Sequence, residues 1–140
     1  MSWRNLDLES AAAAGRIVSA LGKVKKQELE GLCTSAGTVL AENGPYAMFL
    51  YLWSRSRDKG DRTSEALRKE LYSHVCQAVQ WNAGSNSGEA MLQSLAKMSE
   101  DFNRLLLMRK VLSQALSYLR YHAKAIAEES AGKRKETVAP

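Results

Sequence analysis

The placement of proline constrains the fold of this chain more than any other feature. Its two prolines are Pro45 and the final residue, Pro140, and proline interrupts helices more strongly than any other residue. The sequence between them is rich in alanine, leucine, lysine, arginine and glutamate, which all favour helices. No stretch alternates apolar and polar residues as a half-buried strand does. We therefore predict an all-α fold.

Apolar residues at three- and four-residue spacing divide the chain into about six helices. We expect them at 5–21, 25–42, 45–57 and 64–81, through 91–98, and from 100 to about 127, the last being the longest. Thr63 or Ser64 is the expected cap of the fourth helix and Ser99 that of the last, with Glu100 and Asp101 in its first turn. Residues 1–129 would form a single helical bundle domain. Residues 130–140 lack apolar spacing and would form a flexible tail.

The composition is that of an ordinary globular protein, with 45% hydrophobic and 25% charged residues. No stretch approaches the ~18 apolar residues of a membrane span, and the first residues lack the apolar segment of a signal peptide. Cys33 and Cys76 lie among apolar residues at helical spacing, so we interpret them as small buried thiols. We expect a cytoplasmic protein with no membrane partner.

Catalytic patterns are missing from the sequence. It has no Gly-rich phosphate loop, no Cys-x-x-Cys pair and no nucleophile elbow. Neither His74 nor His122 follows a carboxylate by three residues, as histidines of metal-dependent helical enzymes do. We interpret both as structural, with a role as metal ligand or base as the alternative. The expectation is a protein that is not an enzyme and has no cofactor and no small-molecule substrate.

Positive charge is unevenly distributed along the chain. Twenty Lys and Arg against fifteen Asp and Glu give a net charge of +5 and a pI near 9.3. No acid lies between Phe102 and Ala127, where Arg109, Arg120 and Lys124 fall within one sector of a helix. Such cations suit the phosphates of a nucleic acid, and a solvated face is the alternative. Two further candidate clusters are Arg16 with Lys23, Lys25 and Lys26, and Arg55 with Arg57 and Arg62.

Aromatic residues give a weaker signal for nucleic-acid binding. Tyr118 and Tyr121 have rings that can stack on bases, and Trp53 borders a basic cluster, but aromatics at helical spacing more often belong to a core. Residues 27–40 have the length of a DNA recognition helix. However, Glu28 and Glu30 occupy its first turn, where a groove-facing helix should be neutral or basic. We expect contact with the nucleic-acid backbone and no readout of base sequence.

Two segments resemble a known family. Ala115-Leu-Ser-Tyr-Leu-Arg-Tyr-His-Ala-Lys-Ala125 resembles the closing helix of the small all-helical subunit of type III-B CRISPR effector (Cmr) complexes. Tyr118 takes the place of the usual tryptophan there, and Arg120 that of the usual lysine. Asn43-Gly-Pro-Tyr-Ala-Met-Phe-Leu-Tyr51 is similar to the family's Gly-led apolar helix, and the Arg- and Ala-containing first helix is a weaker match. The resemblance covers about residues 10–127.

The resemblance implies a non-catalytic subunit of an RNA-guided, RNA-targeting complex in antiviral defence. Such a subunit would stack with further copies of itself and touch the backbone and large subunits of the Cmr complex. It would also contact the guide RNA and target RNA, whose base pairing supplies sequence specificity. The alternative is a helical protein–protein adaptor that binds no nucleic acid and uses the apolar helix from Tyr46 to Trp53.

Overall fold

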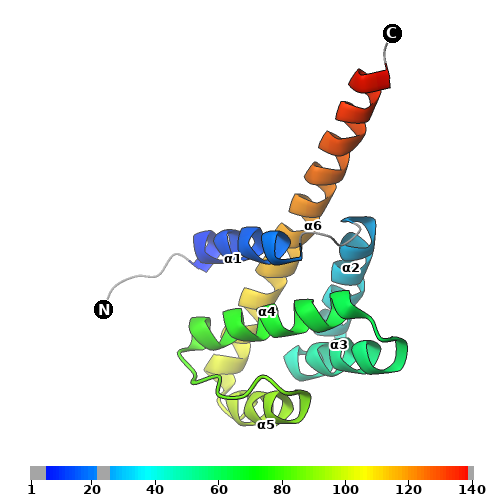
Figure 1. The fold of residues 1–140 in the computed structure, drawn as a ribbon. Coiled ribbons are helices and arrows are strands. Elements are labelled where there is room, and N and C mark those ends of the chain that lie inside the picture. Colours follow the sequence, from blue (N-terminus) through cyan, green and yellow to red (C-terminus); the bar gives the residue numbers. More distant parts are fainter. Residues whose placement is uncertain (1–5, 22–25, 139–140) are drawn as a thin grey trace.

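The computed structural model describes residues 6–21 and 26–138, which form α-helices with no strand among them (Figure 1). The six helices are α1 (Leu6–Ala20), α2 (Lys26–Asn43), α3 (Pro45–Lys59), α4 (Arg62–Val79), α5 (Gly88–Ser99) and α6 (Phe102–Val138). The prediction of an all-α, single-domain fold with a long C-terminal helix is confirmed.

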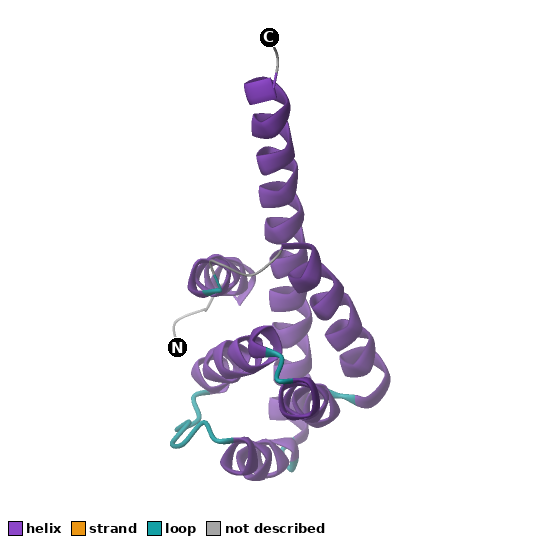
Figure 2. Ribbon diagram, turned by 45° about the vertical axis from the view of Figure 1, so that its right-hand side comes forward, coloured by secondary structure: helices purple, strands orange, loops and turns teal. Residues whose placement is uncertain are grey.

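The long helix α6 is the axis of the bundle. α1 and α2 make the most extensive contacts with it, and α4 also packs on it. α2 runs beside α6 in the opposite direction, while α3, α4 and α5 gather around the first half of α6 (Figures 1 and 2). This antiparallel pairing of α2 and α6 creates the groove described below.

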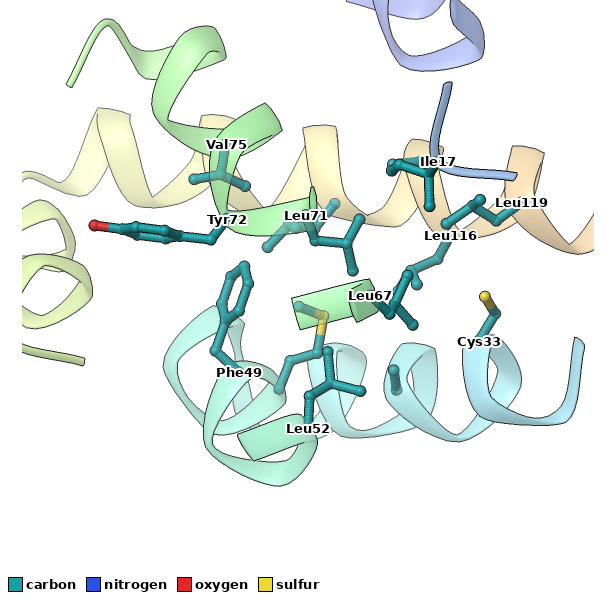
Figure 3. Close-up of a cluster of buried hydrophobic side chains, with 14 of the residues drawn as sticks. Ile17, Cys33, Phe49, Leu52, Leu67, Leu71, Tyr72, Val75, Leu116 and Leu119 are labelled. Atoms are coloured by element: carbon teal, nitrogen blue, oxygen red, sulfur yellow. The ribbon is translucent and has the colours of Figure 1, made fainter. Parts of the chain in front are cut away.

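Side chains from all six helices converge in one hydrophobic core, part of which is drawn in Figure 3. The ring of Phe49 on α3 meets that of Tyr72 on α4 edge to face, with centroids 6.2 Å apart. Burying each large apolar side chain contributes on the order of 1.5–3 kcal/mol, so this core fixes where α2 and α6 lie. Its labelled members in Figure 3 are Ile17, Cys33, Phe49, Leu52, Leu67, Leu71, Tyr72, Val75, Leu116 and Leu119.

The turn between α2 and α3 consists of Gly44 alone. Its φ of +94° and ψ of −179° belong to a region that side chains disfavour, so glycine is required there. Pro45 follows as the first residue of α3, where its missing N–H leaves no helical hydrogen bond unmade. The predicted end of the second helix at residue 42 is therefore confirmed to within one residue.

The cap of α4 differs from the prediction. Asp61 caps this helix, because its carboxylate accepts hydrogen bonds from the backbone N–H groups of Thr63 and Ser64 at 3.0 and 3.2 Å. Thr63 and Ser64, the expected caps, lie inside the helix. A carboxylate at the cap is also favoured by the positive end of the helix dipole, which explains the shift.

The cap of α6 is also shifted. Asp101 accepts hydrogen bonds from the backbone N–H groups of Asn103 and Arg104 and so precedes the helix, which has no acidic residue in its first turn. Ser99, the expected cap, is the last residue of α5. Its hydroxyl donates to the carbonyl of Leu95 within that helix.

α6 also continues further than expected, through Val138. Its backbone is helical across residues 130–138, which the sequence analysis assigns to a tail. Extending an existing helix needs no new nucleus, and this segment contains several good helix formers. The last part of α6 projects beyond the other helices (Figures 1 and 2).

Candidate nucleic-acid interface

A groove between α2 and α6 brings together two of the predicted basic residues. It has a volume of about 660 Å³, and Arg109 and Arg120 both line its α6 side. The positions between them and opposite them carry hydroxyl groups: Ser113 and Ser117 on α6, and Thr34 and Thr38 on α2. The groove therefore combines two permanent positive charges with four small polar groups.

Helical geometry explains why α6 presents these side chains together. At 100° per residue, Arg109, Ser113, Ser117, Arg120 and Lys124 fall within a sector of roughly 80°. The opposite side of α6 is buried in the core through Met108, Val111, Leu112, Ala115 and Leu119. We call the exposed set Arg109, Ser113, Ser117, Arg120 and Lys124 the α6 ridge.

Arg109 joins the ridge to the end of α2. Its Nη2 donates to the carbonyl oxygens of Leu40 and Ala41, each at 3.3 Å. These carbonyls belong to the last turn of α2, where the negative end of the helix dipole favours a cation. A guanidinium has five N–H groups, so this contact holds Arg109 in place and leaves donors for another acceptor.

Arg120 stands beside the buried thiol of Cys33. Burial raises the pKa of this thiol to about 12, and the charge of Arg120 opposes that rise. The thiol therefore stays neutral at physiological pH and does not compensate the guanidinium. Glu42 is the one carboxylate among the described residues that line the groove. The groove as a whole is thus positive.

Arg55 does not belong to the free surface cations with which the sequence analysis grouped it. Its Nε donates to Oδ2 of Asp61 at 2.8 Å. Burial alone would raise the pKa of Asp61, but hydrogen bonds from Arg55 and Ser64 lower it below its usual value. Since Asp61 caps α4, Arg55 supports a helix end. The prediction missed this pair because it spans the turn between α3 and α4.

The other two residues of the predicted cluster, Arg57 and Arg62, have different surroundings. The guanidinium of Arg57 covers the ring of Trp53, 5.4 Å from its centroid. Arg62 is exposed at the start of α4. Trp53, which the sequence analysis considered as a stacking residue, is half-buried and packs against the core. The predicted cluster around this turn is therefore partly engaged within the protein.

The remaining predicted cluster is described only at Arg16. This residue is exposed on α1 and lines a separate hollow that it shares with His74 of α4. Lys23, Lys25 and the side chain of Lys26 lie outside the part of the chain that is described. Among the ten predicted basic residues, the structure brings Arg109 and Arg120 into one groove, with Lys124 exposed one turn further along the same helix.

The two histidines lie in different surroundings. His74 is buried and His122 is exposed. Across residues 6–21 and 26–138, no three His, Cys, Asp or Glu side chains are grouped so that they could hold a metal ion. In that same part of the chain no helix is both long and apolar enough to cross a membrane.

Sequence reasoning missed the most deeply buried charge, Arg68, which is 2% exposed. Its guanidinium binds the carboxylate of Glu65 through Nε and Nη2, and its Nη1 donates to the carbonyl of Asn86 at 2.9 Å. Hydrogen bonding to Arg68 lowers the pKa of Glu65. The pair thus fastens the segment before α5 to α4. The three-residue spacing of Glu65 and Arg68, which places both on one side of a helix, is the sequence feature that could have predicted this ion pair.

Two aromatic rings lie exposed on α6, contrary to the general preference of aromatics for a core. Tyr121 is 70% exposed and Phe102 is 68% exposed. Tyr118, by contrast, is half-buried and packs against the core. Tyr121 is one of the rings that the sequence indicates as candidates for base stacking, whereas Phe102 is not among them. The helical period places both near the ridge side of α6.

The apolar helix α3, which the adaptor alternative takes as its interface, buries most of its large apolar side chains in the core. Met48, Phe49 and Leu52 of α3 are fully buried. Tyr46 and Leu50 on its other side remain exposed, as does Leu106 on α6.

Comparisons of the chain with protein-family models, with curated proteins and with solved structures find no match. Its function must therefore be inferred from its own residues and their geometry.

Proposed function

We propose that this protein is a non-catalytic RNA-binding subunit that holds the RNA backbone on the α6 ridge. The observation that carries the proposal is the groove in which Arg109 and Arg120 stand together with four hydroxyl groups. No acid of α6 between Phe102 and Ala127 neutralises these charges. Unlike Arg55, neither arginine is engaged in an ion pair among the described residues.

The chemistry of the ridge suits phosphates. A guanidinium binds phosphate oxygens with two parallel N–H groups, and serine and threonine hydroxyls are common phosphate and sugar contacts. Arg109 is already oriented by the carbonyls of α2, so less side-chain freedom is lost on binding. Contacts of this kind position a nucleic acid without reading its bases.

The wider setting that we propose is an RNA-guided effector of the type III-B CRISPR (Cmr) kind, acting in antiviral defence. The support is the resemblance of residues 115–125 and 43–51 to the small subunit of these complexes, and residues 115–125 carry Arg120 and Lys124 of the ridge. In this setting the protein stacks with copies of itself, contacts the other Cmr subunits, and touches guide and target RNA.

Neutralising the ridge tests the RNA-binding role. The triple variant Arg109→Gln, Arg120→Gln and Lys124→Gln should lower the affinity for RNA at least about tenfold, because the loss of even one charged hydrogen bond costs about 1.5–3 kcal/mol. Filter binding with the full chain measures this effect.

The control removes charge elsewhere, through Lys69→Gln and Lys97→Gln, which are both exposed and lie outside the predicted basic clusters. Its charge-matched counterpart on the ridge is Arg109→Gln with Arg120→Gln. The control should reduce affinity far less than this counterpart. Equal losses in the two variants would mean that only net charge matters, and would contradict a role for the ridge.

A protein–protein adaptor is the second candidate, and the exposed apolar side chains Tyr46, Leu50 and Leu106 favour it. For an adaptor, the ridge variant would leave RNA retention unchanged. Leu50→Asp and Leu106→Asp would instead abolish co-purification with partner subunits, since an apolar interface does not tolerate a buried charge.

A further inference from the structure

The two exposed aromatic residues of α6 flank Arg109 and Arg120 of the ridge, and Lys124 lies beyond the second of them. Phe102 precedes Arg109, and Tyr121 directly follows Arg120. At 1.5 Å per residue, the two arginines are roughly 16 Å apart along the helix and the two aromatics roughly 28 Å. Phe102 falls within the sector of the ridge, and Tyr121 lies roughly 40° beyond its edge. One side of α6 therefore presents two aromatic rings with Arg109 and Arg120 between them, followed by Lys124.

Packing within the protein does not account for these rings. Both are about two-thirds exposed, so neither contributes much to the core. Among the described residues, neither takes part in a ring–ring or ring–cation contact. An exposed aromatic side chain leaves apolar area in water, which favours any ligand that covers it.

By contrast, two tryptophan rings that lie near basic side chains are covered within the protein. Arg57 covers Trp53, and Arg104 covers Trp81 with its guanidinium carbon 5.1 Å from the ring centroid. Both rings are also packed against the core. Unlike these two tryptophans, Phe102 and Tyr121 leave most of their rings open to solvent.

We infer that the α6 ridge binds an unpaired stretch of RNA, with phosphates at Arg109 and Arg120 and bases stacked on Phe102 and Tyr121. This inference rests on the proposed function. In a duplex the faces of the bases are covered by their neighbours, so only an unpaired strand can turn them toward a protein ring. A basic track with aromatic platforms is the usual arrangement for single strands, and it tolerates any base sequence.

The test compares single-stranded RNA with a duplex hairpin of equal length. Tyr121→Ala and Phe102→Ala should each weaken single-strand binding by the full chain about tenfold, or about 1.4 kcal/mol, and leave duplex binding unchanged. Tyr121→Phe and Phe102→Tyr keep a ring and should retain wild-type affinity. Leu8→Ala removes a large exposed apolar side chain from α1 and serves as the control without effect.

The outcomes separate this inference from the proposed function. If the alanine variants bind single strands as the wild type does, while the ridge variant still loses affinity, stacking is refuted and backbone binding stands. Equal losses on single strand and duplex would also refute stacking. If neither the aromatic variants nor the ridge variant changes affinity, both proposals fail. Thermal unfolding of each variant checks that its fold is intact.

Discussion

Two ionised carboxylates, those of Asp61 and Glu65, stabilise the connections between helices in this bundle. Asp61 accepts the hydrogen bond of Arg55, caps α4 through two backbone N–H groups, and accepts a bond from the hydroxyl of Ser64 at 2.9 Å. Glu65 similarly neutralises the buried guanidinium of Arg68. Both carboxylates must be ionised for these contacts to keep their full strength.

Acid should therefore destabilise the fold through Asp61. Its pKa in the folded protein lies below the ordinary value of 3.8, so its contribution is complete above that value and is lost as the pH falls through the folded pKa. Asp61→Asn keeps a capping side chain but no charge. In urea unfolding between pH 7 and pH 2, the unfolding free energy of the variant should fall less with decreasing pH than that of the wild type. Parallel curves would show that Asp61 does not contribute.

A second prediction at this scale concerns Gly88, the first residue of α5. A Cβ added there would lie 2.0 Å from Cε2 of Trp53, well inside any real contact. Gly88→Ala should therefore cost about 1–3 kcal/mol of stability, as overpacking does.

Gly31 in α2 provides the matched control, because a Cβ there has no atom within 4 Å. Gly31→Ala should stabilise the protein by about 0.5–1 kcal/mol through helix propensity. Thermal unfolding of the two variants should give shifts of opposite sign. A Gly88→Ala protein that melts like the wild type would contradict the close contact with Trp53.

At the scale of helices, the sequence was sufficient to predict the number of helices and most of their positions. Apolar periodicity and the Gly44-Pro45 pair located the helices, because these features act locally. The caps of α4 and α6 were misplaced by two or three residues, since several neighbouring residues can cap a helix. The helical extent of α6 beyond residue 129 was missed because its sequence lacks an apolar stripe.

Truncation distinguishes the part of α6 that supports the bundle from the part that projects. Removing everything after Ile126 should change the unfolding free energy by no more than about 0.5 kcal/mol, because the last described side chain buried on α6 is Ala123. Leu119→Ala, within the core, should cost about 2–5 kcal/mol. Circular dichroism melts compare the two. A large loss on truncation would show that the projecting segment stabilises the bundle.

For the whole molecule, the sequence predicted that the three cations of the ridge share one helix face, but it did not predict the groove. The helical period was enough to align Arg109, Arg120 and Lys124 on one face. The hydroxyls of Thr34 and Thr38 join them only because α2 packs antiparallel to α6, which no local pattern reveals. The ion pair of Arg55 with Asp61 could not be predicted for the same reason, because it depends on how the turn between α3 and α4 folds.

The salt dependence of RNA binding tests the central claim most directly. Each phosphate contact on a single strand contributes about 0.7 to the slope of log affinity against log salt, because it releases a condensed counterion. The triple variant Arg109→Gln, Arg120→Gln and Lys124→Gln should therefore flatten the slope by about 2 relative to the wild type. An unchanged slope, in a variant that folds like the wild type, would contradict phosphate binding by the α6 ridge.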